Sequence, residues 1–149
     1  MAKKKSSGFA LIGVILLIII LLVVVFAFSR KTGGEYDDEK LNALASCLAD
    51  KGVKEYGAFW CPNCAKQEKM FGVGYGIIKS RSVYVECDPR CDVPASELPR
   101  ACRGVVGQTE LCLQKGVEKY PHWEFQDGST LIGVQELNVL AEKAGCQFP

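Results

Sequence analysis

The chain has 149 residues and a formal net charge of +1, from 18 basic and 17 acidic side chains. This length suits one compact domain with a short appendage and excludes two large domains. Acidic and basic residues are interspersed, which excludes the basic stripe of a nucleic-acid-binding protein. The chain contains eight cysteines. Because cytosolic thiols are kept reduced, this number indicates either an oxidised domain outside the cytoplasm or a metal site.

The N-terminal segment is predicted to anchor the chain in a membrane. Residues 9–28 form an apolar run interrupted only by Gly13, and about 20 helical residues cover the ~30 Å hydrocarbon core. Lysines 3–5 precede the run. We therefore expect residues 1–8 in the cytoplasm and the folded part outside it, in a single-pass protein of the cell membrane.

Two other interpretations of this segment compete with a retained anchor. A cleaved signal peptide has a shorter apolar region and a small-x-small cleavage site, of which Ala27-Phe28-Ser29 is a poor version. The stretch Gly8-Phe9-Ala10-Leu11-Ile12 resembles the leader cleavage region of type IV pilins. That family usually carries a glutamate where Gly13 stands, so we expect the anchor to be retained.

The remainder is predicted to be a linker over residues 29–38 and one domain over residues 39–149. Apolar spacing, cap glycines and turn residues predict its elements in chain order. These are a helix Glu39–Lys51, a strand Val53–Trp60, a helix Cys61–Phe71 ended by glycines 72, 74 and 76, a strand Ser82–Cys87, an inserted loop 88–107, a short helix Gln108–Gly116, a hairpin of His122–Gln126 and Ser129–Ile132 turned by Asp127-Gly128, and a helix Val134–Ala144. A strand–helix–strand unit gives a parallel pair and the hairpin an antiparallel pair, so we expect an α/β fold with a central mixed sheet flanked by helices.

The motif Cys61-Pro62-Asn63-Cys64 lies at a predicted strand-to-helix junction. The first turn of a helix presents unpaired N–H groups and a partial positive charge, which stabilise a thiolate. A thiolate attacks disulfides and a thiol does not, so Cys61 is the predicted nucleophile and Cys64 the resolving thiol. Pro62 suits the first turn, where its missing N–H costs nothing.

The same motif is also half of a zinc site, or a purely structural disulfide. A closed zinc site needs a second pair of ligands with similar spacing. Neither Cys87 with Cys91 nor Cys102 with Cys112 provides it, and His122 is the one histidine of the chain. We therefore expect neither a metal nor another cofactor.

The stretch Phe59-Trp60-Cys61-Pro62-Asn63-Cys64 resembles the active-site motif of the thioredoxin superfamily. With Tyr56-Gly57-Ala58 before it, and Tyr84-Val85-Glu86-Cys87 and Tyr120-Pro121-His122-Trp123 further on, it is similar to the thioredoxin-like domain fused to, or paired with, bacterial and plant homologues of vitamin K epoxide reductase. The resemblance covers most of residues 41–146, except the loop after Cys87. It implies a thioredoxin-like fold and a membrane-anchored thiol–disulfide oxidoreductase. The catalytic pair would be Cys61 and Cys64, flanked by Trp60, Pro62, Asn63 and Tyr120.

The resemblance also implies roles for Pro121 and Glu55. Pro121 is expected to follow a cis peptide bond and to face the cysteine pair. Glu55 lies six residues before Cys61, where thioredoxin-like proteins often carry a buried acid that accepts the proton of the second cysteine. The alternative is an exposed glutamate on the strand, because Lys54 beside it shows that the strand tolerates polar residues.

The other six cysteines are candidates for structural disulfides, and their connectivity stays open because sequence alone does not decide it. A bridge between Cys47 and Cys146 would tie the two ends of the domain. Cys87 and Cys112 resemble a second cysteine pair of the domains associated with vitamin K epoxide reductase. That leaves Cys91 and Cys102 to close the inserted loop, or to shuttle electrons to the catalytic pair.

The expected partners are substrate proteins that contain cysteines, the membrane, and a membrane protein similar to vitamin K epoxide reductase that reoxidises the pair and reduces quinone. No nucleic-acid partner is expected. The alternatives are a reductase or isomerase with the same chemistry, and a surface module that is stapled by disulfides and has no enzymatic activity. His122, beside Pro121, either polarises the site or, as we expect, is a hairpin histidine exposed to water.

Overall fold

The computed structural model describes residues 7–29 and 36–149. The chain divides into two compact units, Met1–Glu35 and Tyr36–Pro149. Most of the predicted linker (residues 30–35) and most of the predicted cytoplasmic segment (residues 1–6) lie outside the described residues.

The first unit contains one helix, α1, over Ser7–Ser29. It covers the whole predicted apolar run, and the apolar side chains described between Ile12 and Val25 are all exposed. Where the structure describes side chains, which in α1 is from Ile12 to Val25, no helical stretch meets the length and apolarity of a membrane span.

The second unit is built on a mixed four-stranded sheet with the strand order β2-β1-β3-β4. The strands are β1 (Lys54–Gly57), β2 (Tyr84–Glu86), β3 (His122–Glu124) and β4 (Thr130–Ile132). Strand β1 pairs parallel with β2 and antiparallel with β3, and β3 pairs antiparallel with β4. The predicted parallel pair and antiparallel hairpin are therefore confirmed, and the arrangement fits a thioredoxin-like fold.

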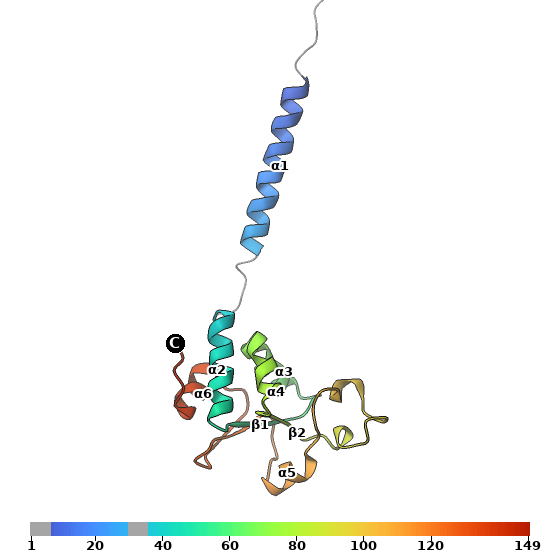
Figure 1. Ribbon diagram of the computed structural model, residues 1–149, viewed down its shortest axis with the longest axis vertical. Coiled ribbons are helices and arrows are strands. Elements are labelled where there is room, and N and C mark those ends of the chain that lie inside the picture. The colour runs from blue at the N-terminus through green and yellow to red at the C-terminus, as the bar shows by residue number, and fades with distance from the viewer. Residues whose placement is uncertain (1–6, 30–35) are drawn as a thin grey trace, which may run out of the picture. The chain divides into compact units, whose positions relative to one another are not determined.

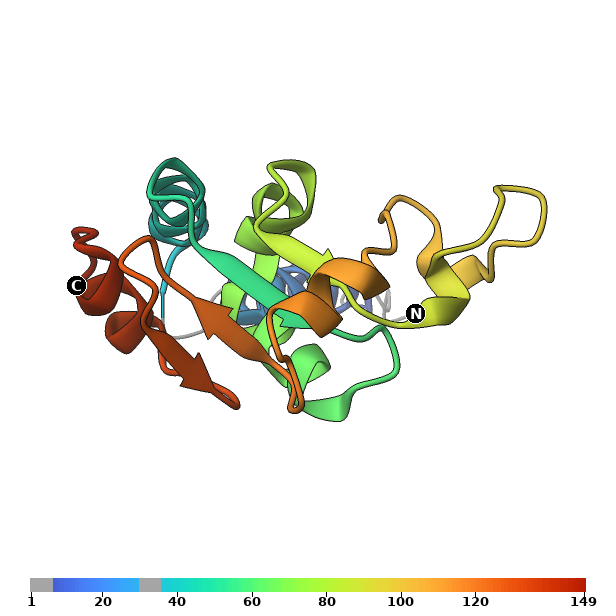
Figure 2. The same cartoon turned by 90° about the horizontal axis from the view of Figure 1, so that it is seen from below.

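Helices cover both faces of this sheet. They are α2 (Asp38–Asp50), α3 (Pro62–Phe71), α4 (Tyr75–Ser80), α5 (Thr109–Gln114) and α6 (Leu137–Ala144). Figure 1 shows α2, α3 and α4 on one side of the strands and α5 on the other. In Figure 2 the inserted loop 88–107 (yellow) and α6 (red) lie at opposite ends of the sheet.

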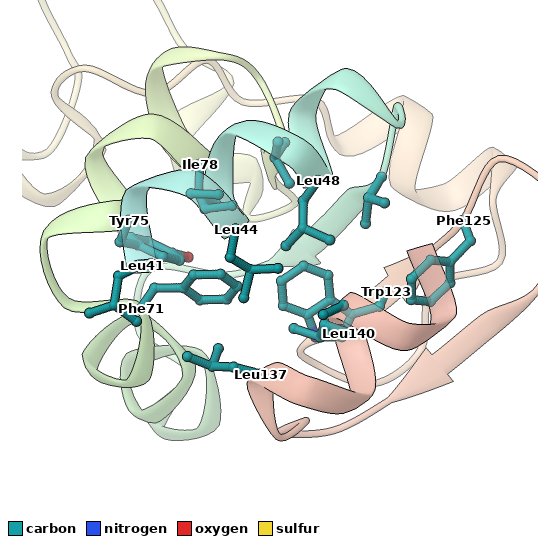
Figure 3. Packing of buried hydrophobic residues seen from close by; sticks show 14 residues of the cluster. Leu41, Leu44, Leu48, Phe71, Tyr75, Ile78, Trp123, Phe125, Leu137 and Leu140 are labelled. Carbon is teal, nitrogen blue, oxygen red and sulfur yellow. The ribbon is translucent and has the colours of Figure 1, made fainter. Parts of the chain in front are cut away.

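The main core lies between the sheet and α2, α4 and α6 (Figure 3). Leu44 and Leu48 from α2, Phe71 from α3 and Leu140 from α6 surround Trp123 of β3, and all five side chains are fully buried. Each such side chain contributes roughly 1.5–3 kcal/mol by leaving water. A smaller core under α5 contains Tyr56, Val85, Cys87 and Cys112.

The structure corrects several predicted boundaries. Strand β1 ends at Gly57 and not at Trp60, because the chain turns there and the Cys61 N–H donates to the Ala58 carbonyl oxygen at 2.9 Å. Helix α6 begins at Leu137, three residues after the predicted start at Val134. Gly145 ends it in the left-handed conformation, as predicted.

Helix α4 was not predicted, because the glycines at 72, 74 and 76 indicated only the end of a helix. The chain instead makes a 3₁₀ turn, η1 (Gly72–Gly74), and becomes helical again at Tyr75. Tyr75 and Ile78 of α4 are buried in the main core. Tertiary packing therefore outweighs the low helix propensity of glycine in this segment.

The hairpin prediction was wrong about its turn. Residues Phe125–Ser129 connect β3 and β4, where a two-residue Asp127-Gly128 turn was expected. The Gly128 N–H donates to the Phe125 carbonyl oxygen, and the Phe125 N–H donates to the Ser129 carbonyl oxygen. Gly128 has a φ of 78°, whereas Asp127 is not in the positive-φ region. Asp127 instead accepts a hydrogen bond from the Ser129 N–H at 2.9 Å.

The close packing of η1 against α2 predicts a strong effect at one glycine. A Cβ on Gly74 would lie 2.6 Å from the Leu41 carbonyl oxygen, which is backbone and cannot rotate away. Gly74→Ala should therefore lower the free energy of unfolding by about 1–3 kcal/mol, measured by denaturant titration.

Gly76→Ala is the matched control, because nothing lies within 4 Å of its Cβ position. It should leave stability unchanged or raise it by up to about 1 kcal/mol, through better helix propensity in α4. Equal losses in the two variants would contradict the packing argument.

Candidate active site

The cysteine pair lies at the start of α3. Cys61 is the N-cap residue, Pro62 is the first helical residue, and the Cys64 N–H donates to the Cys61 sulfur at 3.3 Å. Both sulfur-bearing residues are buried, with exposed fractions of 6% and 5%. A helix N-terminus stabilises negative charge at the position of its cap, so Cys61 is placed to react as a thiolate.

The buried side chain of Gln67 fixes the position of α3. Its amide nitrogen donates to the Gln135 carbonyl oxygen at 3.0 Å, and its amide oxygen accepts from the Gln135 N–H at 2.7 Å. This pair of hydrogen bonds connects α3 to the segment that precedes α6. The sequence analysis did not single out Gln67, because a glutamine on an otherwise polar helix carries no distinctive signal.

Pro121 lies beside the nucleophile. The Tyr120–Pro121 peptide bond is cis, and the Tyr120 carbonyl oxygen is 3.8 Å from the Cys61 sulfur. Tyr120 also packs against Ala58 and both cysteines. The structure therefore brings together two segments that are 59 residues apart.

The start of the inserted loop holds the two aromatic residues that precede Cys61. Asp88 accepts hydrogen bonds from the Trp60 indole N–H and from three N–H groups of Arg90. The Arg90 guanidinium lies over the Phe59 ring at 4.7 Å. The hydrogen bonds from Arg90 lower the pKa of Asp88 to about 2. The sequence analysis missed this contact, because the loop carries no periodic pattern.

Trp60 and Tyr120 form an aromatic border around the cysteine pair. Their rings meet edge to face at a centroid distance of 6.3 Å, and Trp60 is 55% exposed. Asp88, at 7% exposure, accepts the indole N–H, while more than half of the Trp60 side chain stays open to solvent. An exposed ring in a fixed orientation is suited to contact an incoming polypeptide.

Glu55 is fully buried, which decides between the two predicted alternatives. Neither of its carboxyl oxygens has a hydrogen-bond partner among the residues that the structure describes. Burial raises the pKa of Glu55 to about 8. The Tyr75 hydroxyl is close enough to oppose this rise in part, without meeting the geometry of a hydrogen bond.

The Cys64 thiol is difficult to ionise. Burial is the main cause that raises its pKa, the neighbouring Cys61 raises the pKa further, and the charge of Glu55 makes the smallest contribution. Removing the proton from Cys64 is therefore difficult unless a nearby group accepts it. This requirement makes the immediate neighbours of the Cys64 sulfur important for its chemistry.

Tyr84 and Glu86 also lie near Cys64, and the sequence analysis named them only within a family motif. The Tyr84 hydroxyl donates to Glu86 at 2.8 Å, and Glu86 is 1% exposed. The sequence pattern that could have identified this pair is a glutamate two residues after a tyrosine in a predicted strand that also contains valines. Such spacing places both side chains on one face of the sheet.

Among residues 36–149, which contain all eight cysteines, six form disulfides and Cys61 and Cys64 remain as thiols. The disulfides are Cys47–Cys146, Cys87–Cys112 and Cys91–Cys102, with Cα–Cα distances of 6.0, 5.7 and 5.2 Å. These are the three pairs named in the sequence analysis. In the described part of the chain, no three His, Cys, Asp or Glu side chains converge as metal ligands.

His122 does not face the site, and its expected exposure to water was wrong. It is 9% exposed and pairs in register with Tyr56, whose ring meets it edge to face at 5.9 Å. Tyr56 belongs to the smaller core under α5. Burial lowers the pKa of His122.

Comparison with known proteins agrees with this geometry. No family model matches the chain. The thiol–disulfide oxidoreductase LTO1 of Arabidopsis thaliana is 35% identical to it over 103 residues, which are 69% of this chain and 24% of that protein. The chain thus spans about a quarter of the length of this curated relative. The match supports the thiol–disulfide oxidoreductase class for the chain.

Proposed function

We propose that the chain is a protein thiol–disulfide oxidoreductase that acts on cysteine-containing substrate proteins. The observation that carries the proposal is the position of the Cys61 sulfur, which caps α3 and accepts the Cys64 N–H at 3.3 Å. The Tyr120 carbonyl oxygen and the exposed Trp60 lie beside it. The similarity to a thiol–disulfide oxidoreductase supports the same chemistry.

The reaction proceeds through a mixed disulfide. The Cys61 thiolate attacks one sulfur of a disulfide, forms a new S–S bond and releases the other sulfur as a thiolate. Cys64 then loses its proton and attacks the Cys61 sulfur. The Cys61–Cys64 disulfide forms, and the second partner sulfur leaves with the electron pair. The reverse sequence transfers the disulfide to a substrate.

Glu55, when it is ionised, accepts the Cys64 proton in the second step of this mechanism. It is fully buried, lacks a hydrogen-bond partner among the described residues, and raises the pKa of Cys64 through its charge. A base is most effective when its pKa is near the working pH, and burial brings the pKa of Glu55 to about 8.

We further propose that the enzyme works outside the cytoplasm in the oxidising direction. The three disulfides support an oxidising compartment. The resemblance of the motifs around Tyr56, Tyr84 and Tyr120 supports a quinone-linked membrane partner similar to vitamin K epoxide reductase. Equilibration with glutathione buffers measures the direction: a potential near about −120 mV fits an oxidant, and one near about −270 mV a reductant.

Helix α1 is proposed to anchor the enzyme in the cell membrane, with the N-terminus in the cytoplasm. The support is its apolar, uncharged sequence and the exposure of every described side chain between Ile12 and Val25. Anchoring raises the effective concentration of the enzyme around a membrane partner.

The exchange mechanism predicts different defects for the two cysteines. Cys61→Ser should abolish exchange with a substrate protein that carries a disulfide, because the attacking sulfur is lost. Cys64→Ser should form the mixed disulfide and stop, because no resolving thiol remains. Non-reducing gels and intact mass measurement distinguish these outcomes, and full activity in Cys61→Ser would exclude the proposed chemistry.

Glu55→Gln is predicted to change both catalysis and pH-dependent stability. The resolution step should slow by about tenfold above pH 8, where the native carboxyl is ionised and accepts the Cys64 proton. The native carboxyl has a pKa near 8 in the fold and near 4.5 when unfolded, so native stability should fall as pH rises between these values. The Gln variant should lack this fall in denaturant titrations across the same range.

Glu124→Gln is the control, because the pH dependence that Glu124 gives to stability has the opposite sign to that of Glu55. Burial would raise the pKa of Glu124, but hydrogen bonds from Lys115 and Tyr56 outweigh burial and lower it. The stability that this carboxylate contributes is therefore lost as pH falls. The free energy of unfolding of Glu124→Gln should fall furthest below that of the native protein at neutral pH. If Glu55→Gln kept the native pH dependence, Glu55 would not be the buried titrating group.

The anchor is tested by extraction of the full chain from cell membranes. The native chain should remain in the membrane pellet at alkaline pH, and protease added outside should digest the folded unit. The double variant Ile18→Lys/Ile19→Lys should be released, because each central charge costs about 2.5–3.5 kcal/mol. Release of the native chain under the same conditions would exclude the anchor.

A further inference from the structure

We propose that Tyr84 and Glu86 form a second proton relay, which connects the Cys64 thiol with solvent through the cavity beside it. The inference deepens the exchange activity proposed above and rests on it. It assigns a role to a buried carboxylate, Glu86, and to the hydroxyl of a half-buried tyrosine, Tyr84, that the mechanism has so far not used.

The relay begins with the close approach of Tyr84 to Cys64. A Cβ on Gly57 would lie 2.8 Å from the Tyr84 ring, 3.3 Å from its hydroxyl oxygen and 3.1 Å from the Cys64 sulfur. The hydroxyl and the sulfur therefore both lie next to the position that only a glycine leaves open, and a proton passes between them when they approach to hydrogen-bond distance. Glycine at position 57 is what allows strand β2 to bring its tyrosine to the resolving thiol.

Hydrogen bonds give the relay a direction. The Tyr84 hydroxyl donates to one oxygen of Glu86 at 2.8 Å, so its own oxygen is left as an acceptor for a proton from Cys64. The other Glu86 oxygen accepts the Asp88 N–H at 2.9 Å. Glu86 is thus held in place by the backbone and acts on Cys64 only through Tyr84, as a positioning residue.

The cavity supplies the exit to solvent. It has a volume of about 230 Å³, and Cys64, Tyr84 and Glu86 are among its lining residues. Glu68 and Lys79, which also line it, form an ion pair at 3.2 Å whose side chains are 48% and 39% exposed. Ala101 and Val105 of the inserted loop form an apolar wall.

Glu55 has no comparable route. It does not line the cavity and is fully buried. With a pKa near 8 it also holds its own proton for most of the time at neutral pH. Burial raises the pKa of Glu86 as well, but the Asp88 N–H and the Tyr84 hydroxyl oppose the rise. Of the two carboxylates, Glu86 is therefore the one whose charged form is stabilised by hydrogen bonds.

Resolution through the relay moves two protons and breaks one S–S bond as another forms. The Cys64 S–H proton passes to the Tyr84 oxygen while the Tyr84 O–H proton passes to Glu86. The freed electron pair on Cys64 forms the bond to the Cys61 sulfur. The bond between Cys61 and the partner sulfur breaks, and that sulfur leaves as a thiolate with the electron pair. Glu86 then releases its proton to water in the cavity.

The test uses the full chain in its reduced form and one equivalent of the aromatic disulfide dithiobis(nitrobenzoate). Attack by Cys61 releases the first coloured thiolate, and resolution by Cys64 releases the second. Tyr84→Phe, which keeps the ring and its packing, should leave the first phase unchanged and slow the second by about tenfold or more. Its second phase should also show a larger solvent deuterium isotope effect, because proton loss becomes rate-limiting. Glu86→Gln should behave in the same way.

Tyr56→Phe is the matched control. Tyr56 is also a buried strand tyrosine that donates to a glutamate, Glu124, at 2.6 Å, but it belongs to the core on the other face of the sheet. Both of its phases should match those of the native chain. An unchanged second phase in Tyr84→Phe would overturn the relay. A slower second phase with the native isotope effect would also overturn it, because the rate would then have fallen through a shift of the Cys64 sulfur and not through slower proton transfer.

The failure of the relay is distinguishable from failure of the exchange activity. If the native chain gave no second release, or if Cys64→Ser still gave one, the proposed function itself would be wrong. If the native chain gave both phases and Tyr84→Phe matched it, only the relay would be wrong. Should Glu86→Gln not fold, Tyr84→Phe alone decides.

Discussion

The chemistry of this protein depends on the contact between the Cys64 N–H and the Cys61 sulfur at the first turn of α3. That contact requires the helix to begin directly after Cys61, and three local features produce it. The chain turns at Ala58, Pro62 occupies the first helical position, and Gln67 anchors the helix to the segment before α6. The result is one sulfur that is stabilised as an anion and a second, one turn away, that is not.

The sheet keeps the two sulfurs in different environments. One face carries the apolar core around Trp123, together with Glu55 of β1 and Glu86 of β2. Two carboxylates buried on one face cost free energy, and they lie around the thiol that must lose a proton. The opposite face, under α5, has its own tyrosine–glutamate pair, which has no contact with the reactive sulfurs. The polar groups near Cys64 thus have a chemical explanation that packing alone does not provide.

The inserted loop is part of the site. Asp88 joins Trp60 to Arg90 at its beginning, and Ala101 and Val105 close one wall of the cavity beside Cys64. The Cys91–Cys102 disulfide restricts the loop between these two contacts. The loop has only two short 3₁₀ turns, Pro89–Cys91 and Arg100–Cys102. It can still position an aromatic residue at the surface and line a cavity, because covalent and ionic contacts replace a hydrophobic core.

The sequence by itself determined the α/β class, the parallel and antiparallel strand pairs, and the position of the Cys61–Cys64 motif at the start of a helix. These follow from local patterns: apolar spacing, a proline after the first cysteine, and glycines such as Gly145 that end helices. Only the tertiary structure decided that Glu55 and His122 are buried, that α4 exists, and that Tyr84, Glu86 and Asp88 belong to the site. The reason is physical. Burial and the approach of one strand to another depend on side chains far away in sequence. No local pattern predicts that Gly57 leaves room for Tyr84.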